Sequence, residues 1–175
     1  MPDTLGSIGD SAFYECISLQ KLLMPNSVTI VGDSAFYDCR KLCYISLSKS
    51  LSSIGYWTFW GCVKLETINI PNSVISIGAS AFGRCKELRA VIIPENTLRI
   101  EDSAFRRCKK LVSVSLPNTL IHLDASAFSE CELLESIFIK NNNPSLVSNQ
   151  SDVFLRFPDG KEFGRRNTKI KILDS

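Results

Sequence analysis

Hydrophobic and polar positions follow one pattern that returns every 23 residues along most of the chain. Each copy contains an alternating Leu-x-x-Ile-x-Ile segment, usually followed by a proline, and later an Ala-Phe-x-x-Cys segment. The recurring aromatic and thiol positions are Phe13, Phe36, Phe59, Phe82, Phe105 and Phe128, and Cys16, Cys39, Cys62, Cys85, Cys108 and Cys131. Such a fixed period predicts a stack of structural repeats, each of which buries its apolar face against its neighbours.

Six repeats span residues 2–24, 25–47, 48–70, 71–93, 94–116 and 117–139, and we number them 1 to 6. The alternation within each closing segment predicts a short strand with two inward side chains. These inward pairs are Leu22/Met24, Ile45/Leu47, Ile68/Ile70, Val91/Ile93, Val114/Leu116 and Ile137/Ile139. Stacking these strands predicts a parallel sheet on a concave face. The predicted fold is therefore a right-handed leucine-rich repeat solenoid, mainly β with short helical turns.

The wall opposite these strands starts with an aliphatic residue and a glycine in repeats 1 to 4, and we expect that glycine to allow an unusual backbone turn. Glu101 and Asp124 replace the glycine in repeats 5 and 6, so these repeats are expected to differ locally. A serine follows in every repeat except repeat 3, which has Trp57. This serine is predicted to cap one helical turn that carries the buried phenylalanine and cysteine.

The whole chain, 1–175, is predicted to be one solenoid domain, in which residues 140–175 form an irregular seventh turn. The segment Ile170-Lys171-Ile172 repeats the pattern of the sixth strand after a longer interval, so we expect this turn to cap the C-terminal end. The first repeat has no such cap and begins directly after Met1, without a signal-peptide pattern. This start favours a fragment of a longer repeat protein over a short cytoplasmic product.

Charge, hydrophobicity and cysteine spacing limit the classes of function and the cysteine chemistry that the chain can have. The net charge is +2, and no segment is long and apolar enough to span a membrane, so neither a polyanion binder nor a membrane-spanning protein is indicated. Six cysteines in one column should project in parallel, which disfavours both disulfides and a tetrahedral zinc site. We therefore expect free, buried thiols, with Cys43 outside the column as an exposed thiol.

The repeat pattern, and above all its Gly-x-Ser-Ala-Phe-x-x-Cys portion, resembles the BspA-like leucine-rich repeat family over residues 2–139. The resemblance implies a cell-surface or secreted protein that binds protein partners, including host extracellular-matrix proteins, although a cytoplasmic location stays open. It carries over no catalytic residue and no cofactor, because the family's shared positions are structural.

The concave face is the usual binding surface of a repeat stack, and its outward positions are mixed and mostly neutral. We predict that Tyr44, Arg89, Ile92 and Phe138 contribute most to a protein-binding face, because aromatic and arginine side chains dominate interface energetics. A merely solvated face is the alternative.

Two further clusters lie on the opposite wall. One is an aromatic patch that could contact a partner, a second copy of the chain or a sugar ring stacked on Trp60, unless its rings only cover a groove between repeats. Its members are Tyr14, Tyr37, Tyr56, Trp57 and Trp60. The other is a basic patch, which either binds an acidic glycan or is a solvated face whose charge is balanced by Glu87 and Glu130. Its members are Arg84, Lys86, Arg106, Arg107, Lys109 and Lys110.

Enzyme, metal and nucleic-acid functions receive little support. The one histidine, His122, occupies a variable column, and no phosphate-binding loop, nucleophile elbow or metal-ligand cluster occurs. The basic patch is small and lacks interleaved aromatic residues, which disfavours nucleic acid. The sequence therefore predicts a binding module without catalysis or cofactor. A structural or self-assembling module that uses the N-terminal edge and the aromatic patch is the alternative.

Overall fold

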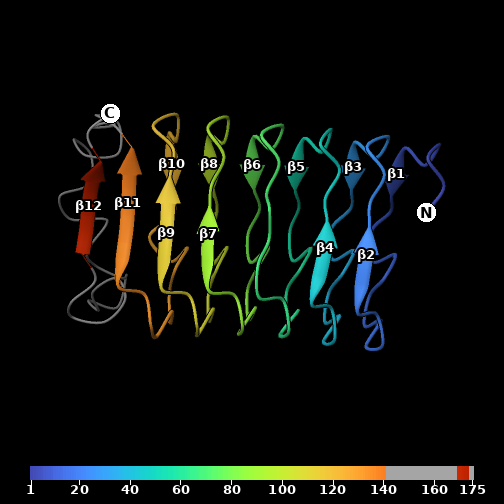
Figure 1. Cartoon of the computed structure of the whole chain (residues 1–175), viewed down its shortest axis with the longest axis horizontal. Coiled ribbons are helices and arrows are strands. Elements are labelled where there is room, and N and C mark those ends of the chain that lie inside the picture. The colour runs from blue at the N-terminus through green and yellow to red at the C-terminus, as the bar shows by residue number, and fades with distance from the viewer. Residues whose placement is uncertain (141–168, 174–175) are drawn as a thin grey trace.

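The computed structural model describes residues 1–140 and 169–173. Within them, short strands recur on two walls of an elongated solenoid (Figure 1). The concave wall contains β2 (Lys21–Leu23), β4 (Tyr44–Ser46), β7 (Ala90–Ile92), β9 (Ser113–Leu116), β11 (Ser136–Lys140) and β12 (Lys169–Leu173). The second wall contains β1 (Ser7–Ile8), β3 (Ile30–Val31), β5 (Ser53–Ile54), β6 (Ser76–Ile77), β8 (Arg99–Ile100) and β10 (His122–Leu123).

All strand pairs are parallel, and within residues 1–140 each pairs residues that are 23 positions apart, such as Leu22 with Ile45 and Val91 with Val114. The predicted inward side chains of the concave strands are buried, except that Ile68 is only half-buried. The predicted solenoid with a parallel concave sheet is therefore confirmed.

The concave sheet is interrupted at repeat 3. The strand predicted around Ile68 and Ile70 is not formed, and the chain runs between β4 and β7 without a strand (Figure 1). The concave strands therefore form two sheets, β2-β4 and β7-β9-β11-β12. Asn69 occupies the middle of this segment, and asparagine is a poor strand former, which gives a local reason for the interruption. The second wall divides at the same place, between β3 and β5.

The predicted serine-capped helical turns are wrong: the described residues contain no helix, and the segments around the phenylalanines are β-turns. The residue expected to cap has positive φ in the first five repeats, at Ser11, Ser34, Trp57, Ser80 and Ser103. A second positive-φ column, four residues on, contains Glu15, Asp38, Gly61, Arg84, Arg107 and Glu130. Positive φ at the third residue of a turn is typical of type II geometry, which local serine preferences did not predict.

These β-turns form a third line of backbone hydrogen bonds between repeats. The N–H groups of Ser34, Phe36 and Asp38, for example, donate to the carbonyls of Tyr56, Thr58 and Trp60. In repeat 5 the Ser103 N–H instead donates to the Ser126 side-chain oxygen, and Ser126 is absent from the positive-φ column. The expected local difference of the repeats that lack the glycine is thus confirmed.

The repeated glycine does not serve the purpose expected from the sequence. None of Gly9, Gly32, Gly55 and Gly78 has positive φ. A Cβ on Gly32 or Gly78 would instead lie 2.7 or 2.8 Å from the backbone carbon of the preceding repeat's glycine. Glycine is therefore required at Gly32 and Gly78 because adjacent repeats approach closely there, whereas a Cβ on Gly9 would meet no atom within 4 Å.

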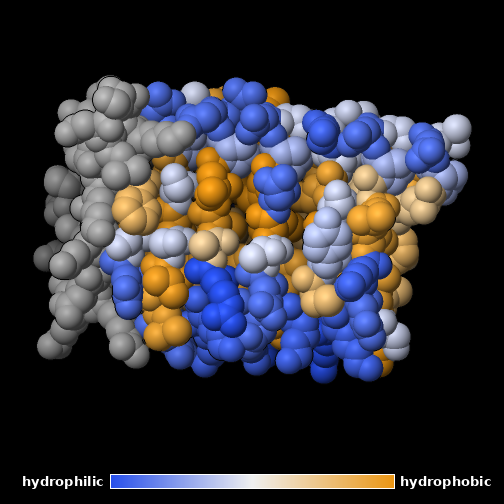
Figure 2. Space-filling model, in the orientation of Figure 1, coloured by the Kyte–Doolittle hydropathy of each residue, from blue (hydrophilic) through white to orange (hydrophobic). Residues whose placement is uncertain are grey.

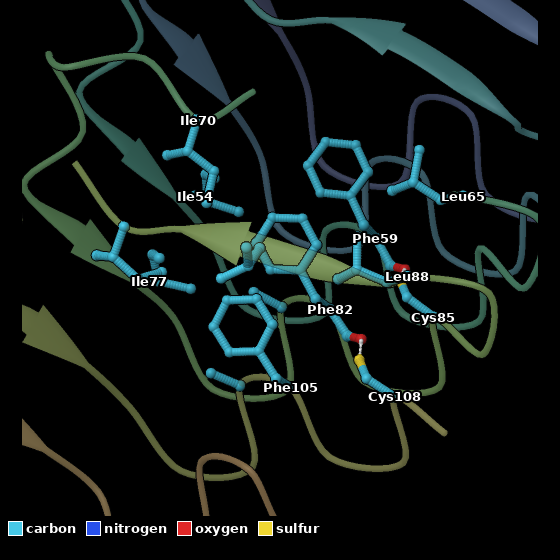
Figure 3. Close-up of a cluster of buried hydrophobic side chains, with 14 of the residues drawn as sticks. Ile54, Phe59, Leu65, Ile70, Ile77, Phe82, Cys85, Leu88, Phe105 and Cys108 are labelled. Atoms are coloured by element: carbon cyan, nitrogen blue, oxygen red, sulfur yellow. Dashed lines mark hydrogen bonds between the residues drawn. The ribbon is translucent and has the colours of Figure 1, made fainter. Parts of the chain in front are cut away.

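The core is one continuous column of stacked rings and thiols (Figure 3). Neighbouring phenylalanines stack with centroid distances of 5.1–5.4 Å from Phe13 to Phe128. From Cys39 onward, each column thiol donates to the carbonyl of the phenylalanine 26 positions earlier, as Cys108 does to Phe82 over 3.2 Å. The predicted free thiols and interior row of phenylalanines are confirmed.

The two ends of the stack differ. Phe13, Cys16 and Leu19 of repeat 1 are only partly buried, whereas their counterparts in repeats 2 to 6 are buried. At the other end β12 pairs with β11, and Ile170 and Ile172 lie in register with Ile137 and Ile139, as the sequence pattern predicted. Most of the predicted seventh turn, residues 141–168, lies outside the described residues, so its role as a cap stays a prediction.

Candidate binding surfaces

The concave face presents the four side chains that the sequence singled out. Tyr44 and Arg89 are exposed, Phe138 is half-buried in β11, and Ile92 is 73% exposed. Leu23, in the same column as Ile92, is 67% exposed and was not among the predicted residues. Figure 2 shows that apolar and polar areas alternate across this face, with hydrophilic side chains along both edges.

A groove of about 460 Å³ opens on the concave side between repeats 2 and 3, where strand pairing stops. Its walls combine one aromatic ring, aliphatic side chains, hydroxyls, two amides and one lysine. The lining residues are Tyr44, Ile45, Ser46, Leu47, Lys49, Thr67, Asn69, Ile70, Pro71, Asn72 and Ser73. This volume lies within the usual range for small ligand sites, about 300–1,000 Å³.

Backbone polar groups on both sides of this groove have no backbone partner. At the junctions of repeats 1–2 and 4–5 the residue that follows the strand donates to the next repeat, as Met24 does to Ser46 and Ile93 to Ser115. Leu47 makes no such bond to Asn69, although both lie within the described residues, and residues 67–70 make no backbone–backbone bond at all. The repeat pattern did not predict this groove; Asn69, and Ser48 in the column where other repeats have proline, are the sequence features that mark its position.

The predicted aromatic patch forms a continuous cluster on the turn wall. Tyr14, Tyr37 and Trp60 stack in a row with centroid distances of 4.7 Å, and Tyr56 stacks on Trp57 at 4.2 Å. Arg84 covers the Trp60 ring from 4.8 Å, and Trp60 also lies against Gly83, where a Cβ would meet the indole at 2.6 Å. Both faces of Trp60 are thus occupied, which leaves no free face on which a sugar ring could stack. Tyr14, Tyr56 and Trp57 remain exposed.

Most of the basic patch is paired with acidic side chains. Glu130 contacts both Arg106 and Arg107 at 2.6 Å, and these arginines lower the pKa of its carboxyl. Lys109 pairs with Glu132 at 2.7 Å, and Lys110 pairs with Glu87 at 2.7 Å. The pairing agrees with the balanced, solvated alternative for this surface rather than with an anion site.

Other polar groups offer little chemistry. His122 lies in β10 with its Nε2 3.4 Å from Glu101. Among the residues that the structure describes, no three histidine, cysteine or acidic side chains gather as a metal site. Burial raises the pKa of the Cys39 thiol to about 11 and also raises that of the Cys62, Cys85 and Cys108 thiols, so these groups stay protonated and poorly nucleophilic at neutral pH.

Parallel strands in 23-residue register, stacked around a phenylalanine column, define a leucine-rich repeat solenoid. The chain matches the BspA type leucine rich repeat region in six copies, over residues 1–109 and 58–155. It therefore belongs to this family, as the sequence resemblance indicated. Proteins built from such repeats generally serve as non-catalytic, protein-binding or surface-associated modules.

Solved structures support this assignment. A leucine-rich repeat protein from Bacteroides ovatus is 36% identical, with a TM-score of 0.71 over 78% of this chain and 37% of that protein. The leucine rich repeat protein of T. pallidum is 35% identical, with a TM-score of 0.74 over 76% of this chain and 62% of that protein. A leucine rich cell surface protein from Faecalibacterium prausnitzii is 27% identical, with a TM-score of 0.54 over 79% of this chain and 31% of that protein.

The chain thus spans 37% and 62% of the lengths of the first two of these proteins. No curated protein sequence matches it significantly. Within the described residues, no helix has the length and apolar character needed to cross a membrane.

Proposed function

We propose that this chain is a non-catalytic recognition module that binds a protein partner through its concave face in surface-associated adhesion. Host extracellular-matrix proteins are the candidate partners. The observation that carries the proposal is the concave face itself, where Leu23, Tyr44, Arg89 and Ile92 are exposed on or beside the strands of the solenoid. Such an arrangement supplies apolar anchors and an arginine without the cost of ordering a loop.

Membership of the BspA type family supports a binding role, and the cell surface description of the F. prausnitzii protein supports the proposed location. The concave face is also weakly charged. Arg89 lies 3.9 Å from Glu66, so its charge is partly balanced at the edge of the surface. A weakly charged surface with exposed aliphatic side chains favours a protein partner over a polyanion.

Surface plasmon resonance on immobilised fibronectin, laminin and collagen tests the proposal. We expect micromolar binding to at least one of these, weakened about tenfold or more by the double variant Arg89→Ala, Ile92→Ser, because truncated interface anchors typically cost at least this much. Ile30→Ser is the matched control, since Ile30 is similarly exposed but lies on the second wall. Absence of binding, or equal losses in both variants, contradicts the proposal.

Self-association through the aromatic patch is the second candidate, favoured by the exposure of Tyr14, Tyr56 and Trp57. Light scattering over a concentration series should then show growth in mass, and Trp57→Ser should abolish it. Serine occupies the same positive-φ position in four other repeats, so this substitution suits the backbone. Constant monomer mass at all concentrations excludes this candidate.

A further inference from the structure

We propose that the groove between repeats 2 and 3 binds an extended segment of the protein partner, with an acidic side chain in the groove and an apolar side chain two residues away on either side. This inference rests on the proposed function and specifies the partner's binding segment.

The places where the peptide's apolar side chains would bind follow from one set of equivalent positions on the concave face. Leu23, Ser46, Asn69 and Ile92 are equivalent positions of repeats 1 to 4. The two outer members, Leu23 and Ile92, are highly exposed, whereas Ser46 and Asn69 line the groove. The column is therefore polar at its centre, and an aliphatic side chain lies on each flank.

The spacing of these flanks matches an extended peptide. Leu23 and Ile92 are three repeats apart, and at about 4.8 Å per repeat, the spacing of paired strands, they are separated by at least about 14 Å, because no strand pairs between β4 and β7. An extended chain advances about 3.3 Å per residue, so residues i and i+4 lie about 13 Å apart and project from the same side. A peptide crossing the strands thus places i and i+4 on Leu23 and Ile92, and i+2 over the groove.

The groove can satisfy the peptide backbone as well. Leu47 is buried, and its N–H lacks a backbone partner within the described residues, as does the Asn69 carbonyl across the groove. Asn69 is exposed, so water can reach its carbonyl, whereas a main-chain N–H of a buried residue such as Leu47 is normally paired with another group or with water. A peptide that crosses the groove can offer one of its carbonyls to the Leu47 N–H.

The positive charge in and beside the groove favours an acidic side chain at position i+2 of the peptide. Lys49 is the one charged residue that lines the groove, and the amides of Asn69 and Asn72 and the hydroxyls of Ser46 and Thr67 can donate hydrogen bonds. Lys21 lies in register with Tyr44 and adds a second positive charge beside the groove. Glu66, which precedes the groove residue Thr67, lies 3.9 Å from Arg89, so its negative charge is partly balanced. An Asp or Glu side chain at i+2 complements this arrangement.

The test is a titration of the 15N-labelled protein with the peptide acetyl-Ser-Leu-Ser-Glu-Ser-Leu-Ser-amide, followed by amide chemical shifts. We expect saturable shifts at the amides of residues 44–47, 67–70, 72 and 73. Replacing the central Glu by Gln, or Lys49 by Gln, should weaken binding about threefold to fivefold, the range of an exposed ion pair. Lys64→Gln is the matched control, because Lys64 is an exposed lysine of repeat 3 outside the groove.

Further outcomes separate this inference from the proposed function. If the peptide shifts no groove amide, or if the Gln peptide and a peptide with its leucines three residues apart bind equally well, the groove proposal is overturned. Matrix-protein binding that depends on Arg89 and Ile92 would still support the concave face. If cellohexaose shifts the groove amides and the peptide does not, the groove is a saccharide site and the peptide proposal is again overturned.

Discussion

The junction between repeats 2 and 3 and the junction between repeats 5 and 6 are held together in different ways. At the latter, β9 pairs with β11 and β8 pairs with β10, and Glu130 joins Arg106 and Arg107 on the outside. At the former no strand pair forms on either wall, although both repeats lie within the described residues.

What remains at the repeat 2–3 junction is the turn wall, the core and a few single hydrogen bonds. The N–H groups of Lys49, Ser52 and Tyr56 donate to the Asn26 side chain, the Thr29 carbonyl and the Asp33 side chain. Three turn hydrogen bonds join Ser34, Phe36 and Asp38 to repeat 3, and Phe36 stacks on Phe59 at 5.4 Å. Outside them Tyr37 stacks on Trp60 at 4.7 Å, a contact that repeats 5 and 6 lack because Arg106 and Ser129 occupy this column there. The comparison shows that the phenylalanine column continues through both junctions, whereas strand pairing on the two strand walls is present at one and missing at the other. The groove opens where that pairing is missing.

Removal of a core ring should have the largest effect, and it should depend on the junction. We expect Phe59→Ala and Phe105→Ala each to lower the free energy of unfolding by about 3–5 kcal/mol, because both rings are fully buried. Only Phe59→Ala should also uncouple repeats 1 and 2 from the rest. Hydrogen exchange should then show faster exchange in repeats 1 and 2 than in repeats 4 to 6. Uniform exchange in that variant contradicts the comparison.

The buried thiols provide a smaller test. The Cys62 thiol donates to the Phe36 carbonyl across the repeat 2–3 junction, which lacks strand pairs. The Cys131 thiol donates to the Phe105 carbonyl across the repeat 5–6 junction, which has them. Each Cys→Ala variant should lose about 1–2 kcal/mol, from lost burial and a lost hydrogen bond. Urea denaturation measures the loss. Cys43→Ala is the control, since Cys43 is exposed and should cost little.

Stability should also fall at alkaline pH. Burial raises the pKa of the Cys62 thiol in the folded protein, so above pH 9 the unfolded chain loses a proton that the folded chain keeps. This contribution is present below the unfolded pKa and decreases above it by about 1.4 kcal/mol per pH unit for each such thiol. Urea titrations at pH 8 and pH 10 should show a smaller decrease for Cys62→Ala than for the unsubstituted protein. Equal decreases would contradict the role of burial.

A substitution that restores the missing strand of repeat 3 should make the repeat 2–3 junction more like the repeat 5–6 junction and stabilise the protein. Asn69→Val introduces a good strand former at an exposed position, and we expect up to about 1 kcal/mol of stabilisation with strand pairing to β4. The Leu47 amide should then exchange more slowly, and the peptide that we propose for the groove should bind less well. Ser18→Val, at an exposed position outside the concave strands, serves as the control substitution.

The surface ion pairs should contribute least. Glu130→Gln removes the carboxylate shared by Arg106 and Arg107 at the repeat 5–6 junction. We expect the free energy of unfolding to fall by less than about 1 kcal/mol, because all three side chains are well exposed. The arginines lower the pKa of Glu130, so its contribution is present at neutral pH and decreases as the pH falls through the folded pKa. Urea denaturation in low and high salt measures it. A loss as large as that of Phe105→Ala would show that the walls, not the core, hold this junction.

The sequence alone determined the repeat length, the inward side chains and the phenylalanine and cysteine columns. These were predictable because every interior position of a solenoid meets its own counterpart 23 residues away, so one periodic pattern describes all its contacts. The chemistry of a buried thiol was likewise expected, although its bond to a carbonyl 26 residues earlier was not.

Only the tertiary structure decided the features in which repeats differ. The positive φ at Ser11 and its counterparts, the occupied faces of Trp60 and the groove beside Leu47 all depend on which groups from adjacent repeats come into contact. Local preference gave a helical turn at those serines, whereas hydrogen bonds to the next repeat hold a β-turn instead. A groove arises when such bonds are lost between two particular repeats, and that loss becomes visible only once their backbones lie side by side.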